Sequence, residues 1–275
     1  MKPARFDYVR AESLAEAHDV LATEGGEASV LAGGQSLLPL LSTRLARPKV
    51  VLDIMRIPGL DLIARESDAI RIGAAVRQAK LAAWPELPAA QPLLAAALPF
   101  VGHAQTRSRG TVCGSIAHAD PSAEIPLVLL ALAGEIILSS RRRLRRVPAA
   151  DFFTGLMSTA REDDELIEAV IIPRRRQGHG YAFREFARRH GDFAIVACAA
   201  IAHERDARLA IGGVGDRPVA FDGLPLYGTA LDKALDRIAD ELDAREDLHA
   251  TAEYRRDLVR RLGRAAIAEA RQCRA

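Results

Sequence analysis

Two glycine-bearing segments contain the residues best suited to bind a ligand. They are AGGQSLLP, residues 32–39, and GTVCGSIAHADP, residues 110–121. Each places small residues beside a hydroxyl side chain. Because glycine has no Cβ, a ligand can approach the backbone closely, and consecutive N–H groups can face an anion such as a phosphate. Two such segments, far apart in the sequence, predict a diphosphate held from two sides, as a dinucleotide cofactor would require.

The first segment lies between a predicted strand, residues 28–31, and a predicted helix, residues 37–45. This position favours anion binding, because the first N–H groups of a helix have no partner within it. A tight turn between strand and helix would produce the same pattern. The residues alone leave both interpretations open.

The second segment is predicted to be a loop, and it offers hydroxyl groups from Thr111 and Ser115 and an accessible backbone at Gly114. Asp120 and Glu124 are suited to accept hydrogen bonds from ribose or ribityl hydroxyls. Asp120 is equally suited to cap a helix that begins at Pro121. The two roles are compatible.

Other candidate chemistry is weaker. His118 and Asp120 lack a third nearby metal ligand, so no metal site is predicted. The sequence places no catalytic histidine near Cys113, and a buried small side chain is favoured there. Phe193 suits either an aromatic ligand or the core. No hydrolase, zinc-protease or Walker motif is present, nor the G-x-G-x-x-G of a Rossmann fold, and no catalytic side chain is predicted.

Composition excludes several classes of protein. The net charge of +2 over 275 residues gives no general attraction to nucleic acid or anionic membrane. Three scattered cysteines cannot bind a four-cysteine iron–sulfur cluster, and their small number is typical of a reducing cytoplasm. We expect neither a signal peptide nor a membrane span. The arginine run 141–146 predicts a solvated strand edge, a hairpin or a contact with a partner subunit.

The remaining pattern predicts a mixture of helices and strands. Ser13 and Glu16 form a capping box for a helix over residues 13–24. Further strands are expected at 50–54, 60–64, 70–74, 135–139, 166–172, 181–187, 195–201 and 209–213. Further helices are expected at 77–84, 92–100, 123–133, 229–242 and 251–271, with a linker at 173–180.

Three motifs in order resemble a known family: residues 32–39, residues 111–121 and the GDFA of residues 191–194. They are similar to the FAD-binding medium subunits of molybdenum hydroxylases, which include the medium subunit of carbon monoxide dehydrogenase and the flavin domain of xanthine dehydrogenase. The resemblance covers essentially the whole chain. It implies an α+β fold with a vanillyl-alcohol-oxidase-type FAD-binding domain over 1–174, in subdomains of about 1–56 and 57–174. A smaller C-terminal α+β domain of the carbon monoxide dehydrogenase flavoprotein type would cover 178–275.

The resemblance also implies roles for individual residues around a non-covalent FAD. One side of the diphosphate would be bound by Ala32, Gly33, Gly34, Gln35, Ser36 and Leu37, and the other by Thr111, Gly114 and Ser115. Lining residues would be Phe100, Val101 and Gly102. Asp120 and Glu124 would reach the sugar-like hydroxyls, and Ile167 and Phe193 would pack near the flavin ring. Arg184 stands roughly where xanthine dehydrogenase has a lysine near the flavin.

Three positions depart from the family pattern. Cys113 stands where a second glycine is usual, and Ser115 where asparagine is frequent. Gln35 replaces the histidine of some carbon monoxide dehydrogenases, which argues against carbon monoxide as the substrate. A cysteine at position 113 would either obstruct a close approach or turn its side chain into the core.

The function implied by the resemblance is electron transfer within an oxidoreductase. The chain would take electrons from the [2Fe–2S] clusters of a small partner subunit and pass them to an external acceptor. A large subunit would carry the molybdopterin, and the assembly would be a cytoplasmic dimer of heterotrimers. Two alternatives remain: a stand-alone flavin oxidase of the same fold, or a structural subunit that has lost FAD.

Overall fold

Three β-sheets follow one another along the chain in the computed structural model, which describes residues 2–274. The first sheet is parallel, in the order β1 (Asp7–Arg10), β3 (Val50–Asp53) and β2 (Ala28–Leu31). The second is antiparallel, in the order β4 (Ile63–Arg65), β5 (Ala69–Gly73), β10 (Leu166–Pro173), β6 (Glu135–Ser139) and β7 (Leu144–Pro148). The third is antiparallel, in the order β11 (Gly180–Phe186), β12 (Val196–Ala202), β13 (Ala207–Gly212) and β14 (Val219–Leu224). Helices and strands are both abundant, so the predicted α+β class is confirmed.

The first sheet carries the helix that the capping box predicted. Helix α1 (Leu14–Glu24) begins after Ser13, whose hydroxyl accepts a hydrogen bond from the Glu16 N–H at 3.2 Å. The Glu16 carboxylate accepts a hydrogen bond from the N–H of Glu12, one residue earlier than in the usual box. Strand β2 then leads directly into the first glycine segment, and α2 (Leu37–Ser42) follows it.

Short helices connect the strands of the second sheet along the chain. They are α3 (Gln78–Ala82), α4 (Leu87–Ala90), α5 (Pro92–Ala97), α6 (Ala104–Arg109), α7 (Val112–His118), α8 (Glu124–Ala131) and α9 (Ala149–Phe152). Single 3₁₀ turns occur at Gly25–Glu27 and Leu98–Phe100, and β8 (Phe153–Gly155) and β9 (Ser158–Thr159) form a small hairpin. Every residue of α8 is buried, because this helix packs against α5 on one side and β12 and β13 on the other.

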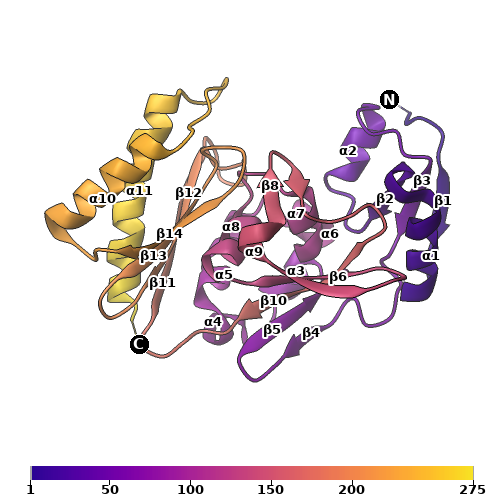
Figure 1. The fold of residues 1–275 in the computed structure, drawn as a ribbon, viewed down its shortest axis with the longest axis horizontal. Coiled ribbons are helices and arrows are strands. Elements are labelled where there is room, and N and C mark those ends of the chain that lie inside the picture. The colour runs from indigo at the N-terminus through magenta and orange to yellow at the C-terminus, as the bar shows by residue number, and fades with distance from the viewer. Residues whose placement is uncertain (1, 275) are drawn as a thin grey trace.

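The third sheet is covered on both faces. One face joins the large core that includes α5 and α8, and α10 (Gly228–Glu241) and α11 (Ala252–Gln272) cover the other. All seven residues of β12, VACAAIA, are buried, which explains why the strand is apolar throughout instead of alternating. The first and third sheets lie at opposite ends of the long axis of the molecule (Figure 1).

The structure also corrects several expectations. Residues 112–118 of the second glycine segment form helix α7 instead of a loop. The arginine run belongs to the β6–β7 hairpin, as one of the three interpretations proposed. Strands β1, β8, β9 and β14 and helices α4, α6 and α9 were not predicted. Among residues 2–274, no helix has both the length and the apolar character needed to cross a bilayer.

Candidate functional site

The first glycine segment supplies a run of free backbone donors. The N–H groups of residues 33–36 donate no hydrogen bond to any residue that the structure describes. The Ser36 hydroxyl precedes α2 without capping it. Gly34 has a φ of 72°, in the left-handed region that glycine adopts without strain. This geometry suits an anion and favours the binding interpretation over that of a simple turn.

The two glycine segments touch each other at Gly33. A Cβ placed on this residue would lie 2.4 Å from the carbonyl oxygen of Arg109 and 2.6 Å from the Cα of Gly110. Glycine is therefore required where the two segments meet. A side chain at position 33 would force them apart.

The second segment is organised by a helix cap. Thr111 precedes α7 and its Oγ1 accepts a hydrogen bond from the Gly114 N–H at 3.0 Å. Cys113, on the first turn, is buried, with its Sγ 3.6 Å from the carbonyl oxygen of Ile72. Burial raises the pKa of this thiol to about 12, so it remains protonated. The cysteine side chain thus turns into the core, although the residue still borders the cavity described below.

Asp120 does not cap a helix at Pro121. Its Oδ1 accepts a hydrogen bond from the Ser122 N–H at 2.8 Å in a local turn, and α8 begins only at Glu124. That part of the prediction is wrong, because the helix begins three residues later than the Asp120–Pro121 pair suggested.

Glu124 is a buried acid with no side-chain partner in the described chain. Only 4% of the residue is exposed. Burial, and to a smaller extent the nearby charge of Asp120, raises the pKa of this carboxyl to about 7. Glu185 on β11 resembles it: burial and the charge of Glu124 raise the Glu185 pKa to about 8, and its Oε2 is buried without a hydrogen-bond partner. Near neutral pH both groups can therefore exist as carboxylic acids that donate a hydrogen bond.

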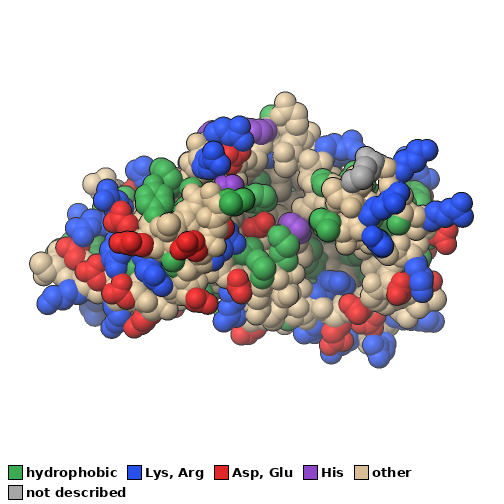
Figure 2. All heavy atoms as spheres, turned by 90° about the horizontal axis from the view of Figure 1, so that it is seen from above, with side chains coloured by type: hydrophobic (Ala, Val, Ile, Leu, Met, Phe, Trp, Pro, Cys, Tyr) green, Lys and Arg blue, Asp and Glu red, His purple; other side chains and the backbone are tan. Residues whose placement is uncertain are grey.

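A cavity of about 550 Å³ opens between the glycine segments, β10 and a loop of the third sheet. Figure 2 shows hydrophobic side chains and a histidine around a hollow near the middle of one face of the molecule. The predicted site residues that line the cavity are Ala32, Gly33, Gly34, Gln35, Ser36, Leu37, Val101, Gly102, Thr111, Gly114, Ser115, Asp120, Glu124, Ile167 and Phe193. The fold thus gathers residues from four separate parts of the chain at one place.

Phe193 belongs to the loop between β11 and β12. Its side chain is exposed, which excludes the alternative of a core residue. The loop is fitted tightly against the rest of the site, because a Cβ on Gly191 would lie 2.6 Å from the His103 ring and 3.0 Å from the Gly102 carbonyl oxygen. The third sheet thereby contributes one wall of the cavity.

Two of the predicted residues do not line this cavity. Phe100 packs behind it, with its ring centroid 5.3 Å from that of Phe183 and 6.0 Å from that of His190. Arg184 donates a hydrogen bond from its Nε to Glu269 of α11 at 2.6 Å. An arginine engaged on the helical side of the third sheet is not placed to contact a ligand in the cavity.

Several lining residues escaped prediction: Ser29, Gln78, Thr106, His118, Arg161 and Glu165. His118 had been considered only as a metal ligand. The others lie in segments without glycine or a recognisable motif, so no local signal marked them. Within residues 2–274 no group of three or more His, Cys, Asp and Glu side chains is arranged to hold a metal ion.

Comparison with known proteins identifies the family of this chain. Residues 4–175 match the family described as the FAD binding domain in molybdopterin dehydrogenase, and residues 181–270 match the carbon monoxide dehydrogenase flavoprotein C-terminal domain. The chain belongs to the FAD-binding medium subunits of molybdenum hydroxylases, and it is an oxidoreductase subunit.

Individual relatives resemble it over nearly their whole length. It is 39% identical to the nicotine 6-hydroxylase medium subunit of Paenarthrobacter nicotinovorans, over 98% of this chain and 99% of the relative. It is 34% identical to the carbon monoxide dehydrogenase medium chain of Hydrogenophaga pseudoflava, over 93% of each. A solved structure of carbon monoxide dehydrogenase from H. pseudoflava, lacking the Mo-pyranopterin moiety, contains a chain that matches with a TM-score of 0.95 at 31% identity, over 100% of both chains.

Proposed function

We propose that this chain binds FAD non-covalently and transfers electrons within a three-component molybdenum hydroxylase. The chain would accept electrons from the [2Fe–2S] clusters of a small partner subunit and pass them to an external acceptor. A large partner subunit would carry the molybdopterin and the substrate site, in a dimer of heterotrimers. The names of the relatives as medium subunits or chains of larger enzymes support these partners.

The observation that carries the proposal is the pair of glycine segments in contact beside the cavity. The N–H groups of residues 33–36 are free, and Gly33 lacks the Cβ that would force the two segments apart. Residues 33–36, Thr111 and Ser115 all line the same cavity. Donors of this kind bind phosphate oxygens without a charged side chain. The residues present therefore fit a dinucleotide.

The proposed roles follow from position. Residues 32–37 and 114–115 would hold the diphosphate, and the half-buried Asp120 and the buried Glu124 would bind sugar-like hydroxyls. Phe193 and the backbone of Val101 and Gly102 would bound the cofactor and restrict water. When bound, the flavin supplies the redox chemistry, and the protein orients and screens it. The proposal retains a FAD-binding domain over 1–174, in subdomains of about 1–56 and 57–174, and a C-terminal domain over 178–275.

The experiment is to purify the chain with the products of its neighbouring genes and record the visible spectrum. Flavin absorption bands, with FAD released into the supernatant by heat, are the expected result. A co-purified assembly that is colourless and stays so when FAD is added would overturn the proposal. A chain that binds FAD and oxidises a substrate without partners would instead support the stand-alone oxidase.

A further inference from the structure

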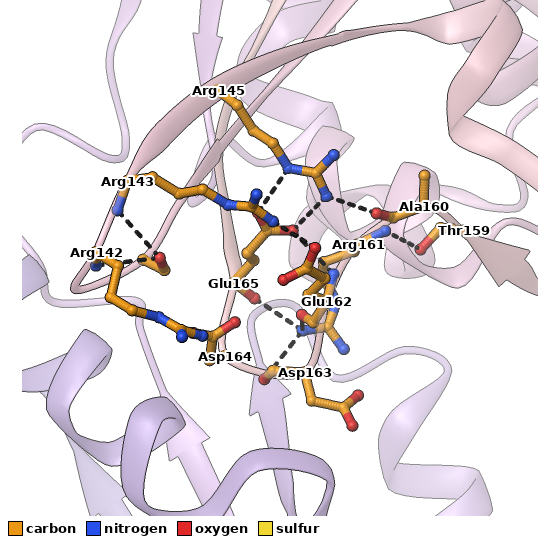
Figure 3. A network of polar contacts seen from close by, with 11 residues as sticks. Arg142, Arg143, Arg145, Thr159, Ala160, Arg161, Glu162, Asp163, Asp164 and Glu165 are labelled. Carbon is orange, nitrogen blue, oxygen red and sulfur yellow. Dashed lines mark hydrogen bonds and ion pairs between the residues drawn. The ribbon is translucent and has the colours of Figure 1, made fainter.

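The loop between β9 and β10 folds around the side chain of Arg161 (Figure 3). Its Nη1 donates hydrogen bonds to the carbonyl oxygens of Glu165 at 2.7 Å and Glu162 at 2.8 Å. These contacts fix the direction of a half-buried guanidinium. Burial lowers the Arg161 pKa, although nearby carboxylates oppose the change, so this cation is partly deprived of water.

The nearest buried carboxylate is already engaged. Glu165 accepts two hydrogen bonds of 2.7 Å from the Nε and Nη2 of Arg145, and a third from the Glu162 N–H at 2.8 Å. Burial opposes the ionisation of Glu165, but these bonds and the charges of Arg145 and Arg143 lower its pKa overall. No carboxylate of the described chain lies within ion-pair distance of Arg161, whereas Arg142, Arg143 and Arg145 each have at least one.

The rest of the guanidinium is open. Nε and Nη2 of Arg161 donate no hydrogen bond to a described residue, and neither atom is among the buried polar atoms that lack a partner. Both atoms therefore keep some solvent exposure. Arg161 lines the proposed cofactor cavity beside Leu166 and Ile167, and it also borders a more open hollow next to Leu21 and Gly25.

The position of Arg161 differs from that of Phe193. Arg161 shares the more open hollow with Leu21 of α1 and with Gly25, whereas Phe193 belongs to the loop between β11 and β12 of the third sheet. Helix α1 and the third sheet lie toward opposite ends of the molecule (Figure 1). Both residues line the cavity together with the two glycine segments. A dinucleotide whose diphosphate rests on those segments would direct one half toward each side. The exposed aromatic Phe193 suits the larger ring system, and the cation suits a nucleotide with phosphate oxygens and ring-nitrogen acceptors.

We propose that Arg161 contacts the AMP half of the cofactor, so that its guanidinium completes its hydrogen bonds on the nucleotide. This inference rests on the proposed function. It places Ile167, two residues beyond Glu165, beside the adenine end, and it differs in this from the expectation that Ile167 packs near the flavin ring. A guanidinium offers a planar fork of donors that lysine lacks, which is why the conservative replacement is informative.

The test measures dissociation constants of FAD, ADP and FMN for the flavin-depleted assembly by calorimetry. Arg161→Ala should weaken FAD and ADP about tenfold, as expected for a lost charge-assisted hydrogen bond, and leave FMN unchanged. The dissociation constants of Arg161→Lys for FAD and ADP should lie between those of Arg161→Ala and those of the wild type. Arg142→Ala is the matched control, because Arg142 belongs to the same network, pairs with Asp164 and does not line the cofactor cavity.

Three results would overturn the inference. One is unchanged FAD and ADP binding in both Arg161 variants. Another is weaker FMN binding with ADP unaffected, which would place Arg161 at the flavin end. The third is an equal loss in Arg142→Ala, which would show that the network only holds the loop in shape. If Arg161→Ala does not fold, Arg161→Lys and Arg161→Gln carry the same comparison. Wild-type protein that binds none of the three ligands would contradict the proposed function itself.

Discussion

Two arginines, one buried and one half-buried, show how the C-terminal domain and the cavity differ. Arg255 of α11 is 1% exposed, donates to the carbonyl oxygens of Ile195 and Gly213 at 2.6 and 2.8 Å, and pairs with Asp247 at 2.6 Å. Arg161 has backbone carbonyl partners but no carboxylate. The first cation is satisfied within the chain. The second, like Glu124, keeps hydrogen-bonding capacity for something that the chain does not provide.

This comparison distinguishes polar groups that are paired within the fold from polar groups that are left for a ligand. Buried polar groups are normally paired, because an unpaired group loses its hydration without compensation. Where several unpaired groups border one cavity, a ligand that completes them is the simplest physical explanation. The comparison predicts that changes near Arg255 act on stability, whereas changes at the cavity act on binding.

The largest effect is expected at Arg255. Arg255→Met would remove the donor to the carbonyl oxygens of Arg245, Ile195 and Gly213 and the 2.6 Å ion pair with Asp247, and breaking a buried ion pair costs about 3–5 kcal/mol. Urea denaturation should show this loss in the free energy of unfolding, with FAD affinity of the remaining folded protein unchanged. Arg256→Met, on the same helix and bonded only to carbonyl oxygens, should cost less. Equal losses of unfolding free energy in both variants would show that the ion pair of Arg255 with Asp247 adds no stability.

Gly33→Ala should have the next largest effect. Its Cβ would lie 2.4 Å from the Arg109 carbonyl oxygen, so the glycine segments would separate and the diphosphate site would be distorted. We expect FAD binding to weaken by at least about 100-fold, roughly 2.7 kcal/mol, measured by flavin fluorescence. Gly155→Ala is the control, because nothing lies within 4 Å of its added Cβ. Normal FAD affinity in Gly33→Ala would show that the two segments do not act together.

Glu124 should make stability depend on pH in an unusual direction. Its pKa is raised to about 7 from 4.5, so the unfolded chain releases this proton first and folding stability falls as pH rises from about 4.5 to 7. The contribution is at most about 3 kcal/mol. Glu124→Gln should remove this slope and also relieve Glu185, whose raised pKa depends partly on Glu124.

Unfolding free energies of wild type and Glu124→Gln at pH 5 and pH 7.5 provide the measurement. Glu165 provides the contrast, because its lowered pKa gives stability that is present above its unfolded pKa and lost as the pH falls through the folded value. A difference between wild type and Glu124→Gln that does not change with pH would show that Glu124 ionises normally in the folded protein.

The smallest effect is expected at Phe193. Removing an exposed ring that packs on a flavin should cost about 1 kcal/mol of binding, a roughly fivefold weaker dissociation constant, and should shift the flavin absorption bands. Phe186→Ala is the control, because Phe186 packs on Tyr254 outside the cavity. Identical spectra for wild type and Phe193→Ala would show that this ring does not contact the flavin.

Sequence reasoning worked best where the determinants are local. The β2 strand was predicted over the residues it occupies, and the helix after Ser13 has its predicted cap, because both depend on a few neighbouring residues. The glycine segments were recognised for the same reason. Local reasoning failed at residues 112–118, where glycine, cysteine and serine suggested a loop. Helix α7 forms there because Thr111 caps it and Val112, Cys113 and Ile116 are buried against the core.

By itself, then, the sequence determined the class of the protein, its two glycine segments and a little under half of the residues that line the cavity. Only the tertiary structure decided which polar groups near that cavity remain unpaired. Glu165 and Arg161 are four residues apart. Glu165 is paired with Arg145 from a neighbouring hairpin, whereas Arg161 has no carboxylate partner in the described chain. The physical reason is that desolvation and pairing depend on what packs nearby in space, and a residue distant in sequence can satisfy a charge that an adjacent residue leaves open.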